Sequence, residues 1–339
     1  MQYLIQFTAG TGDLLRAALV HQFGGLEVRY RDDSAMIIES SVDPEDVAAI
    51  PFIKNAFVVI AETERRSSVD KGIAQFGRIA GNADFRKIPG KIDKFRVVVH
   101  IDGSLVPIDP RARATLERAV AGRTGARLEP RGMCQEYWVV GRQGLDRLVF
   151  CARLAKARRP DAAKGAVSPE LSAMLVAASG PGPRDVFLDP FGGSGSFVAA
   201  RLEQPVGQVW YSDLDLERHR KVFPRQLTAN KRMVRLLAED ALTLPSIGDG
   251  SVDVIVTDPP WGEFETMDMP FEEFARAVGR SFARVLHPAR GRFVVLVNRR
   301  NAQILRDALR AAGLPPNAAH EILVNGHPAT VLVGGRAGR

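Results

Sequence analysis

The segment Asp189-Pro-Phe-Gly-Gly-Ser-Gly-Ser196 decides the fold of the second half of this 339-residue chain. It directly follows the apolar run Val186-Phe-Leu188, which has the length and composition of a buried parallel strand. The glycines let the backbone approach a ligand closely before a helix begins near Ser194. A strand, a glycine-rich turn and a helix in this order predict a nucleotide-type binding turn, although plain strand-to-helix connections also contain glycine.

The glycine spacing narrows the choice of ligand. The segment lacks the Gly-x-Gly-x-x-Gly fingerprint of dinucleotide-binding turns and the Lys-Ser/Thr pair of a triphosphate-binding loop. A phosphate-free adenosine compound fits better, and S-adenosylmethionine is such a ligand. We expect Asp189 and the turn amides to face its methionine end. Asp213, about 20 residues past the first turn, suits the ribose hydroxyls, and Asp240, one strand later, suits the adenine amino group.

A second segment, Asp258-Pro-Pro-Trp-Gly262, follows the apolar run 252–257. Two consecutive prolines remove backbone donors and stiffen the turn, so that carbonyl oxygens point outward without competing amides. Ligands of open parallel sheets bind outside the carboxyl ends of the strands, and both segments are therefore expected at one edge of the sheet. A tight loop capped by a buried Trp is the purely structural interpretation of the same residues.

These residue types suit the methylation of an exocyclic amine on a nucleobase. Such an amine is a poor nucleophile because its lone pair is delocalised into the ring. The Asp258 carboxylate and the carbonyl of Pro259 or Pro260 would each accept one N–H, which aims the lone pair at a sulfonium methyl and stabilises the charge developing on nitrogen. Trp261 would stack on the base, a contact worth about 1 to 3 kcal/mol.

With these residues the second half of the chain resembles the amino-methyltransferases of nucleic acids. It is most similar to the THUMP-domain RNA methyltransferases that modify the guanine N2 position in tRNA. The resemblance rests on residues 164–171, 189–197, 212–215, 258–262 and 282–293. It implies that Ser168 and its neighbours close over the cofactor. Gly192, Ser196 and Trp261 stand where the family usually has Cys, Thr and Tyr, which leaves the exact substrate open.

Positive charge is concentrated in the middle of the chain. Residues 84–160 contain 17 Lys and Arg against 8 Asp and Glu, a net charge of +9, whereas the rest of the chain has 29 against 31 and nets −2. A basic segment beside a methyltransferase domain is typical of a phosphate-binding surface, although a solvated arginine-rich surface has the same composition. The expected partner is therefore RNA, in particular tRNA.

The predicted site residues fall into three groups. The catalytic residues are Asp258, Pro259, Pro260 and Trp261. The cofactor-binding residues are Ser168, Asp189, Phe191, Gly192, Gly193, Ser194, Gly195, Asp213 and Asp240. The RNA-binding residues are Arg86, Lys87, Arg153, Lys156, Arg158 and Arg159.

The expected order of elements divides the first half of the chain into two α+β modules. Residues 1–62 follow the order β-α-β-β-α-β of a ferredoxin-like domain, with Gly24-Gly25 ending the first helix and Asp32-Asp33 turning a hairpin. Residues 63–155 predict a helix and a small mixed sheet that resemble a divergent THUMP domain, an RNA-binding module. Residues 156–167 are expected to be a linker.

Residues 168–339 alternate helix and strand as in a doubly wound α/β domain, which predicts a Rossmann-like methyltransferase fold of class I. One of the expected helices covers residues 216–231. Asn325-Gly326 lies between two apolar runs and predicts a hairpin, which fits the antiparallel final strand pair of such methyltransferases.

Composition makes other classes of protein less suitable. Apolar residues form 45% of the chain and charged residues 25%, which is ordinary for a globular protein. No segment approaches 18 uncharged apolar residues and the N-terminus lacks a basic leader, so a cytoplasmic protein without membrane contact is expected. Cys134 and Cys151 show neither close pairing nor metal-ligand spacing, which predicts no metal site. A monomer is expected.

Three functions remain open from the sequence. The first is an S-adenosylmethionine-dependent methyltransferase acting on N2 of a guanosine in tRNA. The second is an N6-adenine methyltransferase acting on DNA or RNA, because the proline turn would hold either amine. The first half of the chain resembles RNA-binding modules and lacks helix-turn-helix spacing, which favours the first. The third is a catalytically inactive RNA-binding protein, suggested by Gly192 and Trp261.

Overall fold

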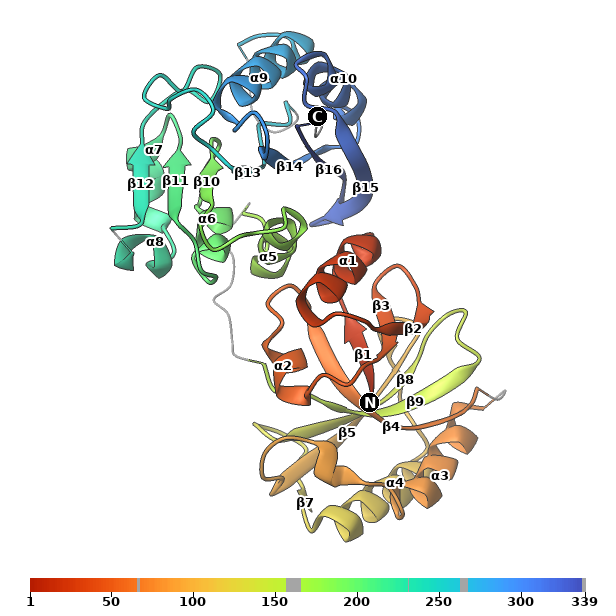
Figure 1. Ribbon diagram of the computed structural model, residues 1–339. Helices are drawn as coiled ribbons and strands as arrows, with labels where there is room; N and C mark the ends of the chain where they lie inside the picture. The colour runs from red at the N-terminus through yellow and green to blue at the C-terminus, as the bar shows by residue number, and fades with distance from the viewer. Residues whose placement is uncertain (66–67, 157–165, 231, 263–267, 337–339) are drawn as a thin grey trace. The chain divides into compact units, whose positions relative to one another are not determined.

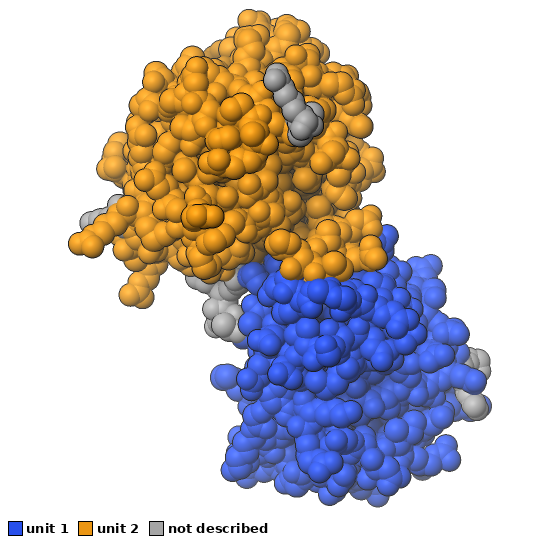
Figure 2. Space-filling model, viewed as in Figure 1, with its two compact units in different colours: residues 1–7, 22–158 blue, residues 8–21, 159–339 orange. Residues whose placement is uncertain are grey.

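The chain folds into two compact units. The computed structural model describes residues 1–65, 68–156, 166–230, 232–262 and 268–336. One unit contains residues 1–7 and 22–158, and the other contains residues 8–21 and 159–339 (Figure 2). Each unit has its own β-sheet (Figure 1). None of the helices in the described part of the chain combines the length and the apolar character needed to cross a bilayer.

The first strands of unit 1 have the order and directions of a ferredoxin-like sheet. The order is β2-β3-β1-β4, and every neighbouring pair is antiparallel. The Asp32 carboxylate fixes the predicted hairpin turn by accepting from the amides of Ser34 and Ala35. The strands and the helix of unit 1 in this segment are β1 (Gln2–Gln6), β2 (Glu27–Arg31), β3 (Ala35–Glu39), α2 (Pro44–Ala49) and β4 (Asn55–Glu64). The helix α1 (Gly12–Phe23), expected as part of the ferredoxin-like module, belongs to unit 2 for most of its length.

The rest of unit 1 extends the same sheet. β4 pairs with β1 on one side and with β9 on the other, so the two modules expected from the sequence share a nine-stranded sheet. The boundary expected after residue 62 falls inside β4, because Thr63 and Glu64 continue the pairing with β9. The further elements are α3 (Val69–Ala80), η1 (Phe85–Lys87), β5 (Lys94–Ile101), β6 (Ser104–Leu105), α4 (Pro110–Thr124), β7 (Arg127–Leu128), β8 (Gln135–Gly141) and β9 (Arg147–Arg153).

The sheet of unit 2 has the predicted doubly wound, Rossmann-like topology. Its order is β12-β11-β10-β13-β14-β16-β15, in which all strands from β12 to β14 are parallel and β16 is antiparallel to both neighbours. The order of strands along the chain reverses between β10 and β13, and such a switch point is where open sheets bind ligands. The strands are β10 (Val186–Asp189), β11 (Gln208–Ser212), β12 (Val234–Leu237), β13 (Val254–Thr257), β14 (Arg292–Asn298), β15 (Pro316–Val324) and β16 (His327–Gly335).

Helices cover both faces of this sheet (Figure 1). On one face α9 (Phe271–Val285) and α10 (Ala302–Ala311) pack together, and Phe282 and Leu305 meet the sheet residue Phe293 in a fully buried core. α5 (Pro169–Ala178) and α6 (Ser196–Arg201) lie on the other face. The hairpin predicted at Asn325-Gly326 is confirmed: both residues have positive φ, 51° and 88°, between β15 and β16.

The single helix predicted over residues 216–231 is wrong. The structure has three short pieces there: α7 (Leu216–His219), η2 (Arg220–Val222) and α8 (Arg225–Ala229). Phe223 and Pro224 between them are extended, with ψ of 134° and 146°. Proline has no amide hydrogen and disfavours a helical residue before it, so a helix cannot run through this point. Residue 231 lies outside the described residues.

Candidate active site

The structure brings the two predicted turns together at the switch point of the sheet. Asp189 is the last residue of β10, and Asp258 directly follows β13, the parallel neighbour of β10. The hydroxyl of Thr257 donates to Asp189 Oδ1 over 2.8 Å and joins the two strand ends. We call residues 189–196 the donor turn and residues 258–262 the acceptor turn.

Asp189 is a fully buried carboxyl group, with 0% of its surface exposed. Its Oδ2 has no hydrogen-bond partner among the described residues. Burial, together with the negative charges of Asp213 and Asp258, raises the pKa of Asp189 to about 8. A buried carboxyl with one oxygen left unpaired, near two further carboxylates, favours a cationic ligand. The ammonium group of S-adenosylmethionine has this chemistry, so the residues present fit that cofactor.

The donor turn is held by its neighbour β11. The amide of Gly193 donates to Asp213 Oδ2 over 2.9 Å, and the hydroxyl of Tyr211 donates to the carbonyl of Gly193 over 2.8 Å. A Cβ atom on Gly192 would lie 2.2 Å from the buried ring of Tyr211. Glycine at position 192, where the resembling family usually has Cys, is therefore required by this tyrosine.

The end of the donor turn packs against α8. Gly195 has a φ of 79°, and a Cβ atom there would lie 2.7 Å from Leu227. The helix α6 begins at Ser196, two residues after the predicted start at Ser194. The hydroxyl groups of Ser194 and Ser196 are hydrogen-bonded to each other over 2.7 Å. Tyr211 and Leu227 therefore pack so closely against the donor turn that only glycine fits at positions 192 and 195.

Asp213 and Asp240 follow β11 and β12 as predicted, and each also holds its own loop. Asp213 accepts from the amides of Gly193 and Asp215, and His219 Nε2 lies 3.6 Å from its Oδ1. Asp240 Oδ1 accepts from the amide of Leu242 over 2.9 Å. Their roles toward the ribose and the adenine stay predictions, and the structure places both at the carboxyl edge of the sheet.

Two further predicted cofactor-binding residues, Ser168 and Phe191, have structural contacts of their own. Ser168 is the N-cap residue of α5, where its hydroxyl accepts from the amide of Leu171. The ring of Phe191 packs against the ring of Phe274, with centroids 5.8 Å apart, and adjoins the main core of unit 2. Phe191 therefore anchors the donor turn in the core, while its predicted contact with the cofactor stays a prediction.

The acceptor turn is stabilised by polar contacts. The indole N–H of Trp261 donates to Asp258 Oδ1 over 2.7 Å. The carbonyl of Trp261 accepts from the side-chain amides of Asn298 at 3.2 Å and of Asn301 at 2.9 Å. The predicted stacking role of Trp261 stays a prediction, and its hydrogen bond to the Asp258 carboxylate is an additional role. The two prolines, Pro259 and Pro260, lie inside this closed turn.

Sequence reasoning missed Thr257, Tyr211, Asn298 and Asn301. Thr257 carried an accessible signal, since it is a polar residue at the end of an otherwise apolar strand, directly before Asp258. Asn298 ends β14 in the same way and is almost fully buried. Polar residues at the carboxyl ends of parallel strands are therefore the pattern that would have found both.

The predicted RNA-binding residues are spread over unit 1. Arg86 is exposed and forms an ion pair with Asp84 at 2.9 Å, and Lys87 beside it is exposed. The ammonium group of Lys156 donates to the carbonyl of Ile53. Arg158 and Arg159 lie outside the described residues. The RNA-binding role of these residues stays a prediction.

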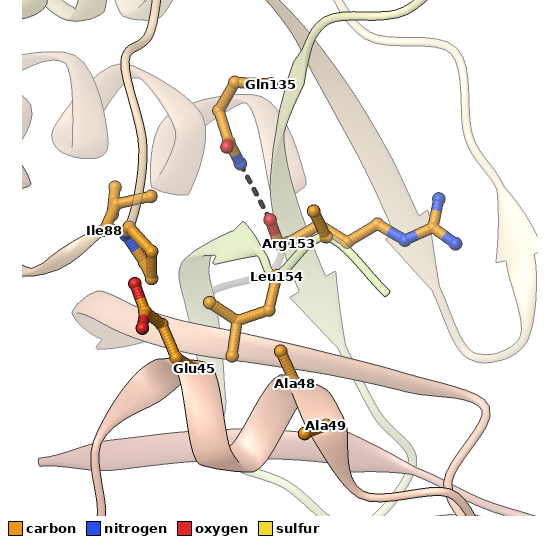
Figure 3. A pocket seen from close by; sticks show the side chains of 9 residues that line it. Glu45, Ala48, Ala49, Ile88, Gln135, Arg153 and Leu154 are labelled. Carbon is orange, nitrogen blue, oxygen red and sulfur yellow. Dashed lines mark hydrogen bonds between the residues drawn. The ribbon is translucent and has the colours of Figure 1, made fainter. Parts of the chain in front are cut away.

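Arg153 lines a cavity of about 310 Å³ in unit 1. In Figure 3 its side chain extends away from Glu45 on the opposite wall, and its carbonyl accepts from the side-chain amide of Gln135. Its guanidinium group donates to Glu136 and to Asn55, at 2.8 and 2.7 Å. Arg153 thus already holds three parts of unit 1 together. The structure shows no cluster of three or more potential metal ligands within the residues it describes.

Comparison with known proteins gives one family and several relatives. Residues 156–206 and 225–325 match the family model described as RMKL-like, methyltransferase domain. Over 169 residues the chain is 32% identical to the tRNA (guanine(6)-N2)-methyltransferase of Thermus thermophilus. That alignment covers 48% of this chain and 47% of the relative, so the match spans about half the length of the curated protein.

Two solved structures share the fold over nearly the whole chain. TrmN from Thermus thermophilus has a TM-score of 0.75 at 21% identity and covers 99% of this chain and 100% of its own. SMU.472, solved in complex with SAH, has a TM-score of 0.65 at 13% identity and covers 100% of this chain and 98% of its own. The second unit of the chain is therefore similar to the RMKL-like methyltransferase domain.

Proposed function

We propose that this protein transfers a methyl group from S-adenosylmethionine to the exocyclic N2 amine of a guanosine in tRNA. The observation that carries the proposal is the meeting of the donor turn and the acceptor turn through Thr257 and Asp189. The similarity to the Thermus thermophilus relative, a tRNA guanine-N2 methyltransferase, supports the choice of base and of RNA. Action on tRNA in the cytoplasm, as a monomer, belongs to the same proposal.

The residues of the chain have distinct tasks in this reaction. When bound, the cofactor supplies an electrophilic methyl group on a sulfonium sulfur. Asp189 would hold the ammonium end of the cofactor, and the backbone of the donor turn would pack against its methionine part. Asp258 and a proline carbonyl would accept the two N–H groups of the guanine amine, which frees its lone pair and stabilises the positive charge on nitrogen. As the N–C bond forms the C–S bond breaks, the cofactor would leave as S-adenosylhomocysteine, and the surplus proton on nitrogen would pass to the Asp258 carboxylate. The indole N–H of Trp261 keeps the Asp258 carboxylate in a fixed orientation.

Product analysis tests the choice of base. Purified protein is incubated with labelled S-adenosylmethionine and unmodified tRNA, and the RNA is digested to nucleosides. We expect N2-methylguanosine. N6-methyladenosine as the product would replace the proposal by the adenine alternative, because the acceptor turn suits either amine. Binding of the cofactor without any methylated nucleoside, over a full set of tRNAs, would contradict both.

Binding of tRNA at several salt concentrations tests the role of unit 1. Arg86→Glu and Lys87→Glu, in the basic segment, are expected to weaken tRNA binding and to reduce the slope of log affinity against log salt by about one per lost phosphate contact. The affinity for S-adenosylhomocysteine is expected to stay unchanged. Lys54→Glu, which reverses an exposed charge outside the basic segment, is the matched control. If all three replacements changed tRNA binding equally, the basic segment would not be part of the proposed RNA-binding surface.

A further inference from the structure

One hydroxyl group connects the donor turn to the acceptor turn. Thr257 is the last residue of β13, and its Oγ1 donates to Asp189 Oδ1 over 2.8 Å. Both side chains are fully buried. The next residue, Asp258, begins the acceptor turn. A single hydrogen bond therefore ties the Asp189 carboxyl group, predicted to bind the cofactor, to the strand that precedes the acceptor turn.

This bond determines which oxygen of Asp189 is left for a ligand. The hydroxyl of Thr257 occupies Oδ1, whereas Oδ2 has no partner in the described part of the chain. A buried, unpaired carboxylate oxygen is unfavourable until a donor reaches it, so Asp189 Oδ2 is suited to one specific contact. Threonine suits the task because its branched Cβ restricts the rotation of the hydroxyl in a strand.

We propose that Thr257 is a positioning residue: its hydroxyl fixes the Asp189 carboxylate so that Oδ2 receives the amino group of the cofactor, in register with the acceptor turn. The part of this inference that concerns the acceptor turn rests on the proposed function. Thr257 itself touches neither the cofactor nor the base and acts through Asp189.

A purely structural role and a positioning role of Thr257 predict different effects of the replacement Thr257→Val. Valine has the same shape as threonine, so the packing of β13 against β10 survives Thr257→Val while the hydrogen bond is lost. The Asp189 carboxylate then has one donor less, its charged form becomes less favourable, and an ammonium ligand binds more weakly. The loss is confined to ligands that carry an amino group.

Calorimetry of ligand binding tests the proposal. Thr257→Val is expected to weaken the binding of S-adenosylhomocysteine by about tenfold, the size of one hydrogen bond to a charged group. The weakening is expected to grow as the pH falls through about 8, the pKa of Asp189, because the variant takes up a proton there more readily. Thr257→Ser keeps the hydroxyl and is expected to restore most of the affinity. Thr330→Val, which removes a buried threonine hydroxyl from β16, is the control for packing.

A second ligand separates positioning from structure. 5′-Methylthioadenosine lacks the amino-acid end, and its affinity is expected to be the same for wild type and Thr257→Val. Equal weakening of both ligands, or an unchanged affinity for S-adenosylhomocysteine, would overturn the proposal. If Thr257→Val does not fold, Thr257→Cys, a weaker donor of similar size, gives the same comparison. Binding is measured without RNA, so a failed search for N2-methylguanosine would leave this result intact.

Discussion

The donor turn and the acceptor turn lie side by side at the end of β10 and β13, yet they are held in place by opposite means. The donor turn depends on space, since Gly192 and Gly195 lie against Tyr211 and Leu227 with no room for a Cβ atom. The acceptor turn depends on polar contacts, which link Trp261 to Asp258 and to two asparagines outside the turn. We therefore expect larger side chains to disturb the donor turn, and the loss of polar side chains to disturb the acceptor turn.

The difference follows from what the proposed reaction requires of each turn. The donor turn has to bring its backbone against a ligand, and only small residues allow that approach. The acceptor turn has to keep carboxylate and carbonyl oxygens pointed at a weakly nucleophilic amine, and only fixed dipoles do so without reorganisation during the reaction. Replacements in the two turns should therefore separate binding of the cofactor from methyl transfer.

The largest effect is expected from Asp258→Ala in the acceptor turn. Loss of the main acceptor for the amine should lower single-turnover methylation of tRNA by at least about 100-fold. Binding of S-adenosylhomocysteine at neutral pH should stay equal or become tighter, because the charge of Asp258 contributes to the raised pKa of Asp189. Asp249→Ala, an exposed aspartate elsewhere in unit 2, is the control. If Asp258→Ala weakened cofactor binding as much as it slowed methyl transfer, the two turns would not have separate roles.

Gly192→Ala should have the next largest effect, in the donor turn. The added Cβ would displace the buried ring of Tyr211, and such overpacking costs about 1 to 3 kcal/mol. We expect a lower melting temperature and a loss of S-adenosylhomocysteine binding. Adding a second replacement, Tyr211→Ala, removes the ring that the new Cβ atom would contact. The double variant should therefore recover part of the binding of S-adenosylhomocysteine. Gly248→Ala has no contact closer than 4.0 Å and should behave as wild type. A tolerated Gly192→Ala would show that the turn does not depend on space.

Asp189→Asn should have opposite effects on stability and on binding. The pKa of Asp189 is raised to about 8, so between its ordinary value and pH 8 the folded protein holds a proton that the unfolded chain has released. Stability from this group is therefore lost as the pH rises through that range. The empty Asn variant should melt at a higher temperature than wild type at pH 8 and bind S-adenosylhomocysteine more weakly. Equal melting curves at every pH would contradict the raised pKa.

The smallest effect is expected from Asn298→Ala. It removes one of the two amides that hold the carbonyl of Trp261, and a hydrogen bond of this kind contributes about 1 kcal/mol. Single-turnover methylation should fall about fivefold, while the affinity for S-adenosylhomocysteine stays the same. Asn301→Ala should have a similar effect, and the double variant a larger one. A change in cofactor affinity would assign the asparagines to the donor turn instead.

The sequence predicted the parts of the fold that depend on local pattern. Apolar runs located β10 and β13, and the Asn325-Gly326 turn located the final hairpin. The break at Pro224 was not predicted, although a proline inside an expected helix is itself the signal for a break. The contact between Thr257 and Asp189 was missed for another reason, since the two residues are 68 positions apart and meet only after the sheet has formed.

The pairing of β4 with strands on both of its sides has a consequence for the engineering of unit 1. β4 contributes hydrogen bonds to β1 at its beginning and to β9 along most of its length. Cutting the gene after residue 62 would sever this shared strand and leave a long row of amides and carbonyls open to intermolecular association. The two halves of unit 1 are therefore expected to unfold as one cooperative block.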